Sequence, residues 1–194
     1  AYYEKSKNIP ILREVDVLVA GGGTAGMIAG LAAARAGANT LVLERLNCLG
    51  GNFTAGLMTT TWTFNDQKKL VVKGIPLELI NRLEEAGGTI KGDKSTETFV
   101  NYDTEMAKFI IFDMYEKEKN LDVLFYTWVC DTIVEDNIVR GVIIESKSGR
   151  QVVLAKTVID CTGDADVAAR GGADYQKASN QSSGKGRRCR LKTA

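Results

Sequence analysis

Histidine is absent from the 194 residues of this chain. Its absence removes the imidazole as a general base, as a metal ligand and as an attachment point for a cofactor. The four cysteines are scattered and form no C-x-x-C pair, which argues against a zinc site and a dithiol redox centre. We therefore expect no metal ion. Cys130 and Cys161 lie in apolar stretches, where buried free thiols are expected.

The sequence also lacks an excess of charge and a long apolar run. Its 25 lysines and arginines nearly balance 24 aspartates and glutamates, which leaves a formal net charge of +1. This balance gives no general attraction to nucleic acid or to an anionic membrane. No apolar run approaches the ~20 residues of a membrane-spanning helix, and no signal-peptide pattern opens the chain. We expect a cytoplasmic protein without nucleic-acid or membrane partners, although prior removal of a signal peptide would leave the same pattern.

A glycine-rich turn is the strongest feature that is present. Residues 15–26 read V-D-V-L-V-A-G-G-G-T-A-G, an apolar strand that runs into a turn and the start of a helix. In such a turn Gly21 permits the tight bend, Gly23 lets backbone approach a phosphate, and Gly26 lets the helix pack closely on the strand. The G-x-G-x-x-G spacing alone is weak evidence, but the flanking strand and helix are the context that a dinucleotide site requires.

The residues after this turn complete a strand, helix and strand unit. Apolar residues recur at helical spacing from Ile28 to Ala36, Gly37 is placed to end the helix, and Thr40–Leu43 predicts a buried strand. That strand ends in Glu44, about 20 residues past the glycines, where an acid binds the ribose hydroxyls of an adenosine. The alternative is a solvated acid at the end of a strand.

The middle of the chain changes character. Gly50–Gly56 forms a loop of small residues that is able to approach a ligand closely. Residues 59–100 then predict a small insertion or lid with one short helix, which begins near Pro76 and ends at Gly87.

The second half of the chain predicts a long helix followed by strands. Asp103 suits a helix N-cap, and Met106, Phe109, Ile110 and Met114 give an apolar stripe. Residues 121–129 predict one buried strand, residues 130–156 an antiparallel β-meander, and residues 157–160 a further strand that ends near Thr162 and Gly163. Residues 176–194 are small, polar and basic, and predict a disordered or aberrant tail.

This order of elements resembles the glutathione-reductase-like FAD-binding fold. The runs G-G-N-F-T-A-G at 50–56 and I-D-C-T-G-D-A-D-V-A at 159–168 look most like the branch called FAD-dependent oxidoreductases. The resemblance covers roughly residues 15–175. It implies an α/β fold, namely a Rossmann-like FAD-binding domain with a parallel sheet and an inserted antiparallel β-meander. The chain then divides into an N-terminal arm at 1–14, this domain at 15–175, and the tail at 176–194.

The resemblance also implies a set of cofactor-binding residues. The glycine turn and helix start would hold the pyrophosphate, and the acid after the second strand the adenosine ribose. The double-glycine loop would lie along the pyrophosphate and ribityl side, one backbone position of the meander would meet adenine, and the last loop would close on the phosphates. The pyrophosphate residues would be Gly21, Gly23, Thr24, Ala25 and Gly26, and the ribose residue Glu44. Along the pyrophosphate and ribityl side would lie Arg45, Gly50, Gly51 and Asn52. The adenine contact would be Val129, and the closing loop Thr162, Gly163 and Asp164. Cys161 stands where alanine is usual in this family, and no redox role is assigned to it.

The implied function is that of an oxidoreductase with non-covalent FAD. The flavin N5 would accept a hydride from a small-molecule substrate, and the protein would position and shield the ring. No side chain is assigned a catalytic role. Family members continue past the point where this chain stops, so we expect a truncated chain, completed by a second segment or by a homo-oligomer. The alternatives are a non-catalytic fragment that binds an adenine dinucleotide and, as a lesser rival, an NAD-dependent dehydrogenase.

Overall fold

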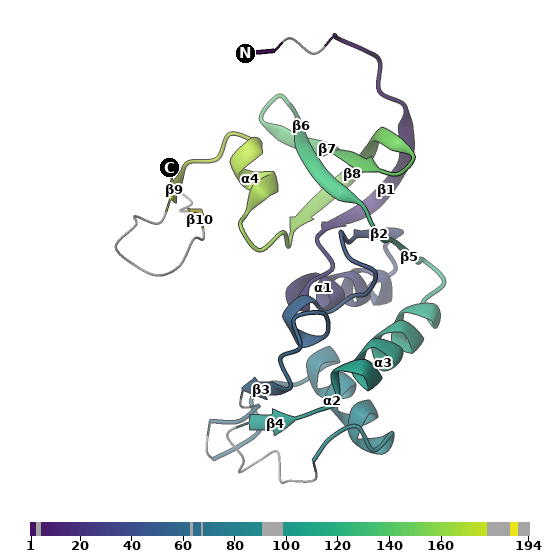
Figure 1. Cartoon of the computed structure of the whole chain (residues 1–194), viewed down its shortest axis with the longest axis vertical. Helices are drawn as coiled ribbons and strands as arrows, with labels where there is room; N and C mark the ends of the chain where they lie inside the picture. The colour runs from purple at the N-terminus through teal and green to yellow at the C-terminus, as the bar shows by residue number, and fades with distance from the viewer. Residues whose placement is uncertain (3–4, 63, 67, 91–98, 178–186, 190–194) are drawn as a thin grey trace.

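A six-stranded sheet organises the chain (Figure 1). The computed structural model describes residues 1–2, 5–62, 64–66, 68–90, 99–177 and 187–189. The strand order is β5-β2-β1-β8-β7-β6, and β5, β2, β1 and β8 run parallel to one another while β7 and β6 are antiparallel. The strands are β1 (Ile11–Ala20), β2 (Thr40–Leu43), β5 (Leu121–Leu124), β6 (Trp128–Glu135), β7 (Ile138–Ser146) and β8 (Gly149–Asp160).

The first three helices cover one face of the parallel strands, and the antiparallel strands pack with the fourth helix on the other face. The helices are α1 (Thr24–Arg35), α2 (Ile75–Glu85), α3 (Thr104–Glu116) and α4 (Asp166–Arg170). One core cluster joins Val19 and Val42 to residues of α1, α2 and α3. A second joins Leu18 and Leu41 to Val142 of β7 and to residues of β8 and α4. These two cores confirm the predicted Rossmann-like α/β fold. No helix within the described ranges is long and apolar enough to cross a membrane.

Three short elements lie outside the main sheet. The strands β3 (Thr60–Trp62) and β4 (Phe99–Asn101) pair within the predicted insertion, and η1 (Gly51–Phe53) is a 3-10 turn in the double-glycine loop. The strands β9 (Tyr175–Lys177) and β10 (Arg187–Cys189) pair where a structureless tail is predicted. The rest of that tail lies outside the described residues.

Two strand predictions differ from the structure. The predicted single strand at 121–129 is two strands at opposite edges of the sheet, because the chain turns at Tyr126, whose φ is +53°. The predicted strand at 157–160 is instead the last part of β8, which begins in the meander and ends beside β1. β1 itself begins at Ile11, within the predicted N-terminal arm.

Helix α3 begins at the predicted residue, and its buried stripe matches the predicted one in part: Met114 is buried, and Met106 and Ile110 pack partly buried against the core. The Asp103 side chain accepts hydrogen bonds from the backbone N–H groups of Glu105 and Met106, as an N-cap does. Phe109, predicted to lie in the buried stripe, is instead 75% exposed. The buried stripe is Ala107, Ile111, Met114 and Tyr115, which share one face of the helix. Apolar residues on both faces of α3 made the choice between two stripes ambiguous.

Replacing Asp103 with alanine is expected to lower the free energy of unfolding by about 1 kcal/mol. The loss arises because two backbone N–H groups at the start of α3 then lack their carboxylate acceptor. Urea unfolding followed by circular dichroism measures the change. Asp103→Asn keeps an acceptor oxygen and is expected to retain most of the stability, and an unchanged midpoint in Asp103→Ala would contradict the assignment.

Candidate functional site

The candidate site is a cleft at the carboxyl ends of the parallel strands. Gly21 follows β1, Glu44 follows β2 and Cys161 follows β8, and all three line the cleft. Its volume of about 310 Å³ lies within the range of ligand pockets. Ligands of open α/β sheets bind at this edge, at the point where the order of the strands reverses. The topology therefore explains why separate sequence segments meet here.

Glycine is required sterically at two positions of the turn after β1. A Cβ on Gly21, whose φ is +103°, would lie 2.4 Å from the carbonyl oxygen of Cys161. A Cβ on Gly26 would lie 1.8 Å from the carbonyl oxygen of Gly21. A Cβ on Gly23, by contrast, would meet nothing within 4 Å. Gly21 and Gly26 thus allow the close packing of strand and helix, and Gly23 leaves open space in the cleft.

The start of α1 is fitted to receive an anion. Gly23 is its N-cap and no acidic residue lies in its first turn. The first N–H groups of a helix lack intrahelical partners and carry the positive end of the helix dipole. The double-glycine loop is fastened beside this helix start, because Gly50 N–H donates to Gly22 O at 2.8 Å and Thr24 Oγ1 donates to Gly50 O at 2.9 Å. The glycine turn and this loop thus form one cradle of the size and sign that a pyrophosphate needs.

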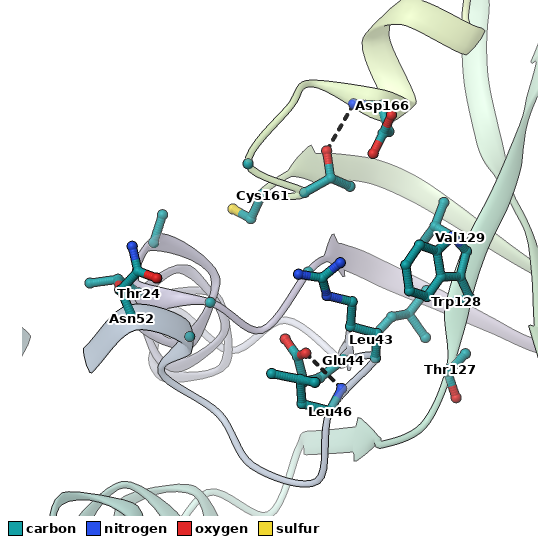
Figure 2. A pocket seen from close by; sticks show the side chains of 17 residues that line it. Thr24, Leu43, Glu44, Leu46, Asn52, Thr127, Trp128, Val129, Cys161 and Asp166 are labelled. Atoms are coloured by element: carbon teal, nitrogen blue, oxygen red, sulfur yellow. Dashed lines mark hydrogen bonds between the residues drawn. The ribbon is translucent and has the colours of Figure 1, made fainter. Parts of the chain in front are cut away.

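Glu44 places a buried carboxylate in the middle of the cleft. Its side chain accepts two backbone hydrogen bonds of 2.8 Å, from Gly22 N–H to Oε2 and from Leu46 N–H to Oε1. The residue is 6% exposed, and Figure 2 shows it between Thr24 on one side and Trp128 on the other. An ionised carboxylate has about four acceptor positions, so each oxygen retains acceptor capacity toward ribose hydroxyls.

Beyond Glu44 the cleft ends at an aromatic ring and a guanidinium group. Thr127, Trp128 and Val129 line this end (Figure 2). The guanidinium carbon of Arg45 lies 5.3 Å from the centroid of the Trp128 ring. This distance is within the range of a cation–π contact. A planar base fits such an environment, since aromatic rings and guanidinium planes both stack on bases.

The opposite wall is the loop between β8 and α4. Asp160 Oδ1 accepts from the backbone and the hydroxyl of Thr162, and its Oδ2 accepts from Ala168 N–H at 2.9 Å. The Thr162 hydroxyl in turn accepts from Asp166 N–H at 2.8 Å. These bonds fix the backbone of Thr162 and Gly163 where both line the cleft.

Most of the predicted cofactor-binding residues meet in this one cleft. It is lined by Gly21, Gly23, Thr24, Ala25, Glu44, Arg45, Gly51, Asn52, Val129, Thr162 and Gly163. Gly26, Gly50 and Asp164 do not line it: Gly26 packs beneath Gly21, and Gly50 packs against Thr54. Six further residues line the cleft that the sequence prediction did not include: Leu43, Leu46, Thr127, Trp128, Cys161 and Asp166. Most of them are next to a predicted residue in the sequence and enter the cleft with it.

Cys161 is half-buried rather than buried, and it lines the cleft. Burial raises the pKa of its thiol, and the negative charge of Asp160 raises it further. A thiol with a raised pKa is a poor nucleophile at neutral pH, because the thiolate is the reactive form. Among the described residues, no cluster of three or more cysteine, aspartate or glutamate side chains is arranged to hold a metal ion.

Comparison with known proteins gives a family match. The family described as FAD dependent oxidoreductase matches residues 16–190. The thiamine thiazole synthase of Pyrococcus furiosus is 30% identical over 164 residues, which are 77% of this chain and 58% of that protein. The 3-oxosteroid 1-dehydrogenase of Mycolicibacterium smegmatis is 34% identical over 101 residues, which are 51% of this chain and 18% of that protein. The chain thus spans less than two thirds of the length of either relative.

Solved structures share the fold. The crystal structure of Thermovibrio ammonificans THI4 superposes with a TM-score of 0.59 at 21% identity, over 84% of this chain and 64% of that one. The 3-ketosteroid-delta4-(5alpha)-dehydrogenase of Rhodococcus jostii superposes with a TM-score of 0.60 at 18% identity, over 79% and 47% of the two chains. At these identities the likeness concerns the arrangement of sheet and helices.

Proposed function

This chain belongs to the FAD dependent oxidoreductase family, and we propose that it holds the FAD of an enzyme that oxidises or reduces a small molecule. One observation carries the proposal: the open start of α1 and the buried carboxylate of Glu44 face the same cleft. The first suits a pyrophosphate and the second suits an adenosine ribose.

Each wall of the cleft has a part in this proposal. The N–H groups at the start of α1, with Gly51 and Asn52 beside them, bind the pyrophosphate. Glu44 accepts hydrogen bonds from the ribose, and the Arg45 and Trp128 end receives adenine. Thr162 and Gly163 close on the phosphates from the opposite side. Bound FAD supplies hydride transfer with the substrate. The proposed enzyme is completed by a further segment or by a second copy of the chain, which would contribute to the substrate side.

Binding of FAD by the purified chain tests this proposal. We expect FAD to stay bound through gel filtration, to give flavin absorption bands that bleach on addition of a reductant, and to bind more tightly than NAD. ADP is expected to compete with FAD, because the cleft residues recognise the adenosine and pyrophosphate half. FAD is also expected to slow alkylation of Cys161, which lines the cleft, relative to Cys48, which does not.

The outcomes separate the competing functions. Tighter binding of NAD than of FAD would favour a nicotinamide-dependent dehydrogenase, and failure to bind either would refute the proposal. Binding of FAD that a chemical reductant reduces but no candidate substrate reduces would favour a non-catalytic dinucleotide-binding protein. The beta-meander and the Thr162–Gly163 loop support FAD over NAD, since a plain nicotinamide domain needs neither.

A further inference from the structure

Arg170, at the end of α4, reaches the base end of the cleft. Its Nη1 donates a hydrogen bond of 2.8 Å to the carbonyl oxygen of Val129, which lines that end. No motif in the sequence pointed to Arg170. The contact therefore links an exposed side chain outside the cleft to a backbone group within it.

The backbone of β6 is irregular at this point. The pairing of β6 with β7 shifts register between Val129 and Asp131, which places a β-bulge at Cys130. A bulge disrupts the ladder locally and leaves a residue without its regular pairing. The Cys130 thiol contacts the carbonyl oxygen of Trp128 at 3.6 Å. Side chains thus supplement the ladder hydrogen bonds in this stretch of backbone, and Arg170 is one of them.

Helix α4 is also bonded to both walls of the cleft. On the base side, Thr132 Oγ1 of β6 donates to Val167 O at 2.9 Å, and Val167 is buried. On the phosphate side, Asp166 N–H and Ala168 N–H donate to Thr162 Oγ1 and Asp160 Oδ2. Arg170 therefore extends from an element that is already held in place.

We propose that Arg170 is a positioning residue that aligns the Val129 backbone with the edge of an adenine base. This inference rests on the proposed function, which places the base beyond Glu44. Adenine presents an amino group on its edge, and this group donates to a carbonyl oxygen. A carbonyl oxygen accepts two hydrogen bonds, so Arg170 holds the Val129 oxygen through one lone pair and leaves the other for the base.

Calorimetric titration of the full chain with ADP and IDP tests this role. IDP carries a carbonyl oxygen where ADP carries the amino group, so position 6 of its base cannot donate to Val129 O. We expect Arg170→Met to weaken ADP binding by about fivefold to tenfold, the effect of one hydrogen bond. IDP binding is expected to change little, so the ratio of the two dissociation constants approaches one. Arg170→Lys keeps a cationic donor and is expected to restore part of the ratio.

A matched variant and a stability measurement complete the test. Arg140 pairs with Glu135 at 3.7 Å and does not line the cleft, so Arg140→Met is expected to leave both affinities unchanged. A purely structural role for Arg170 would weaken ADP and IDP by the same factor, in step with a lower Tm, and would overturn the inference. Unchanged ADP binding, or a larger preference for ADP, would overturn it too. If the unaltered chain bound neither ADP nor FAD, the proposed function itself would fail.

Discussion

Gly26→Ala is expected to lower the free energy of unfolding by about 3 kcal/mol and to abolish tight FAD binding. Alanine favours a helix interior by about 1 kcal/mol over glycine, so propensity alone predicts a gain. The added Cβ, however, would lie 1.8 Å from Gly21 O and 3.2 Å from Cys161 Cβ. The first of these atoms is backbone, so the clash is relieved only if α1 moves away from the turn. Such a shift also displaces the N–H groups that face the cleft.

Gly23→Ala is the matched control for this variant. Its Cβ would meet no protein atom within 4 Å, and the φ of −64° at Gly23 suits alanine. Alanine is a poorer N-cap than glycine but reduces the entropy of the unfolded chain, so stability is expected to change by less than about 1 kcal/mol. FAD affinity is nevertheless expected to fall, because the new methyl group projects into the cleft.

Urea unfolding and FAD titration of both variants separate steric packing from ligand contact. The expected pattern is loss of stability and binding in Gly26→Ala, and loss of binding alone in Gly23→Ala. Equal stability of Gly26→Ala and the unaltered chain would show that the helix accommodates the methyl group, and would contradict the packing role of Gly26.

The sequence predicts the glycine turn and its flanking elements well because their constraints are local. Gly21 bends the chain, Gly26 packs on Gly21, and Glu44 directly follows the next strand, all within a short stretch of chain. The N-cap of α3 is local for the same reason, since the Asp103 side chain accepts hydrogen bonds from residues two and three positions along the chain. Each of these features follows from residue type and spacing, without knowledge of distant contacts.

The features that the sequence did not predict depend on distant contacts. The break after β5 falls at Tyr126 and Thr127, residue types that favour strands. Their backbone N–H groups instead donate to Leu46 O and Glu44 O in the loop after β2. The residues near Tyr126 in the sequence do not predict these hydrogen bonds. The same turn brings Trp128 into the cleft. Phe109 of α3 was misplaced for a related reason, because the packing of neighbouring elements decides which apolar side chains of the helix are buried.

Glu44→Gln is expected to weaken ADP binding by at least about tenfold and to lower the free energy of unfolding by about 1–3 kcal/mol. The carboxylate accepts from Gly22 N–H and from Leu46 N–H through different oxygens. A glutamine side chain has one acceptor oxygen and an NH₂ group that only donates. One of the two N–H groups therefore faces a donor, and this happens with or without a ligand. Urea unfolding of the ligand-free chain measures this first effect.

The second effect of Glu44→Gln concerns the ribose. A carboxylate accepts hydrogen bonds from ribose hydroxyls and repels a phosphate on the 2′ position. The unaltered chain is therefore expected to bind AMP far more tightly than 2′,5′-ADP, which is AMP with a phosphate on the 2′ oxygen. In Glu44→Gln the repulsion disappears and a hydroxyl acceptor is lost, so the two dissociation constants are expected to converge. Isothermal titration of each variant with both ligands measures this ratio independently of turnover.

Glu135→Gln provides the control, since this carboxylate is 68% exposed and does not line the cleft. It is expected to change stability by less than about 0.5 kcal/mol and to leave the ligand ratio as it is. Loss of stability in Glu44→Gln without a change in the ratio would mean that Glu44 only ties the glycine turn to the loop after β2. A change in both the stability and the ligand ratio would mean that one carboxylate holds the cleft together and also selects the ribose. Each of its oxygens accepts one hydrogen bond from the backbone, and the remaining lone pairs accept hydrogen bonds from the ligand.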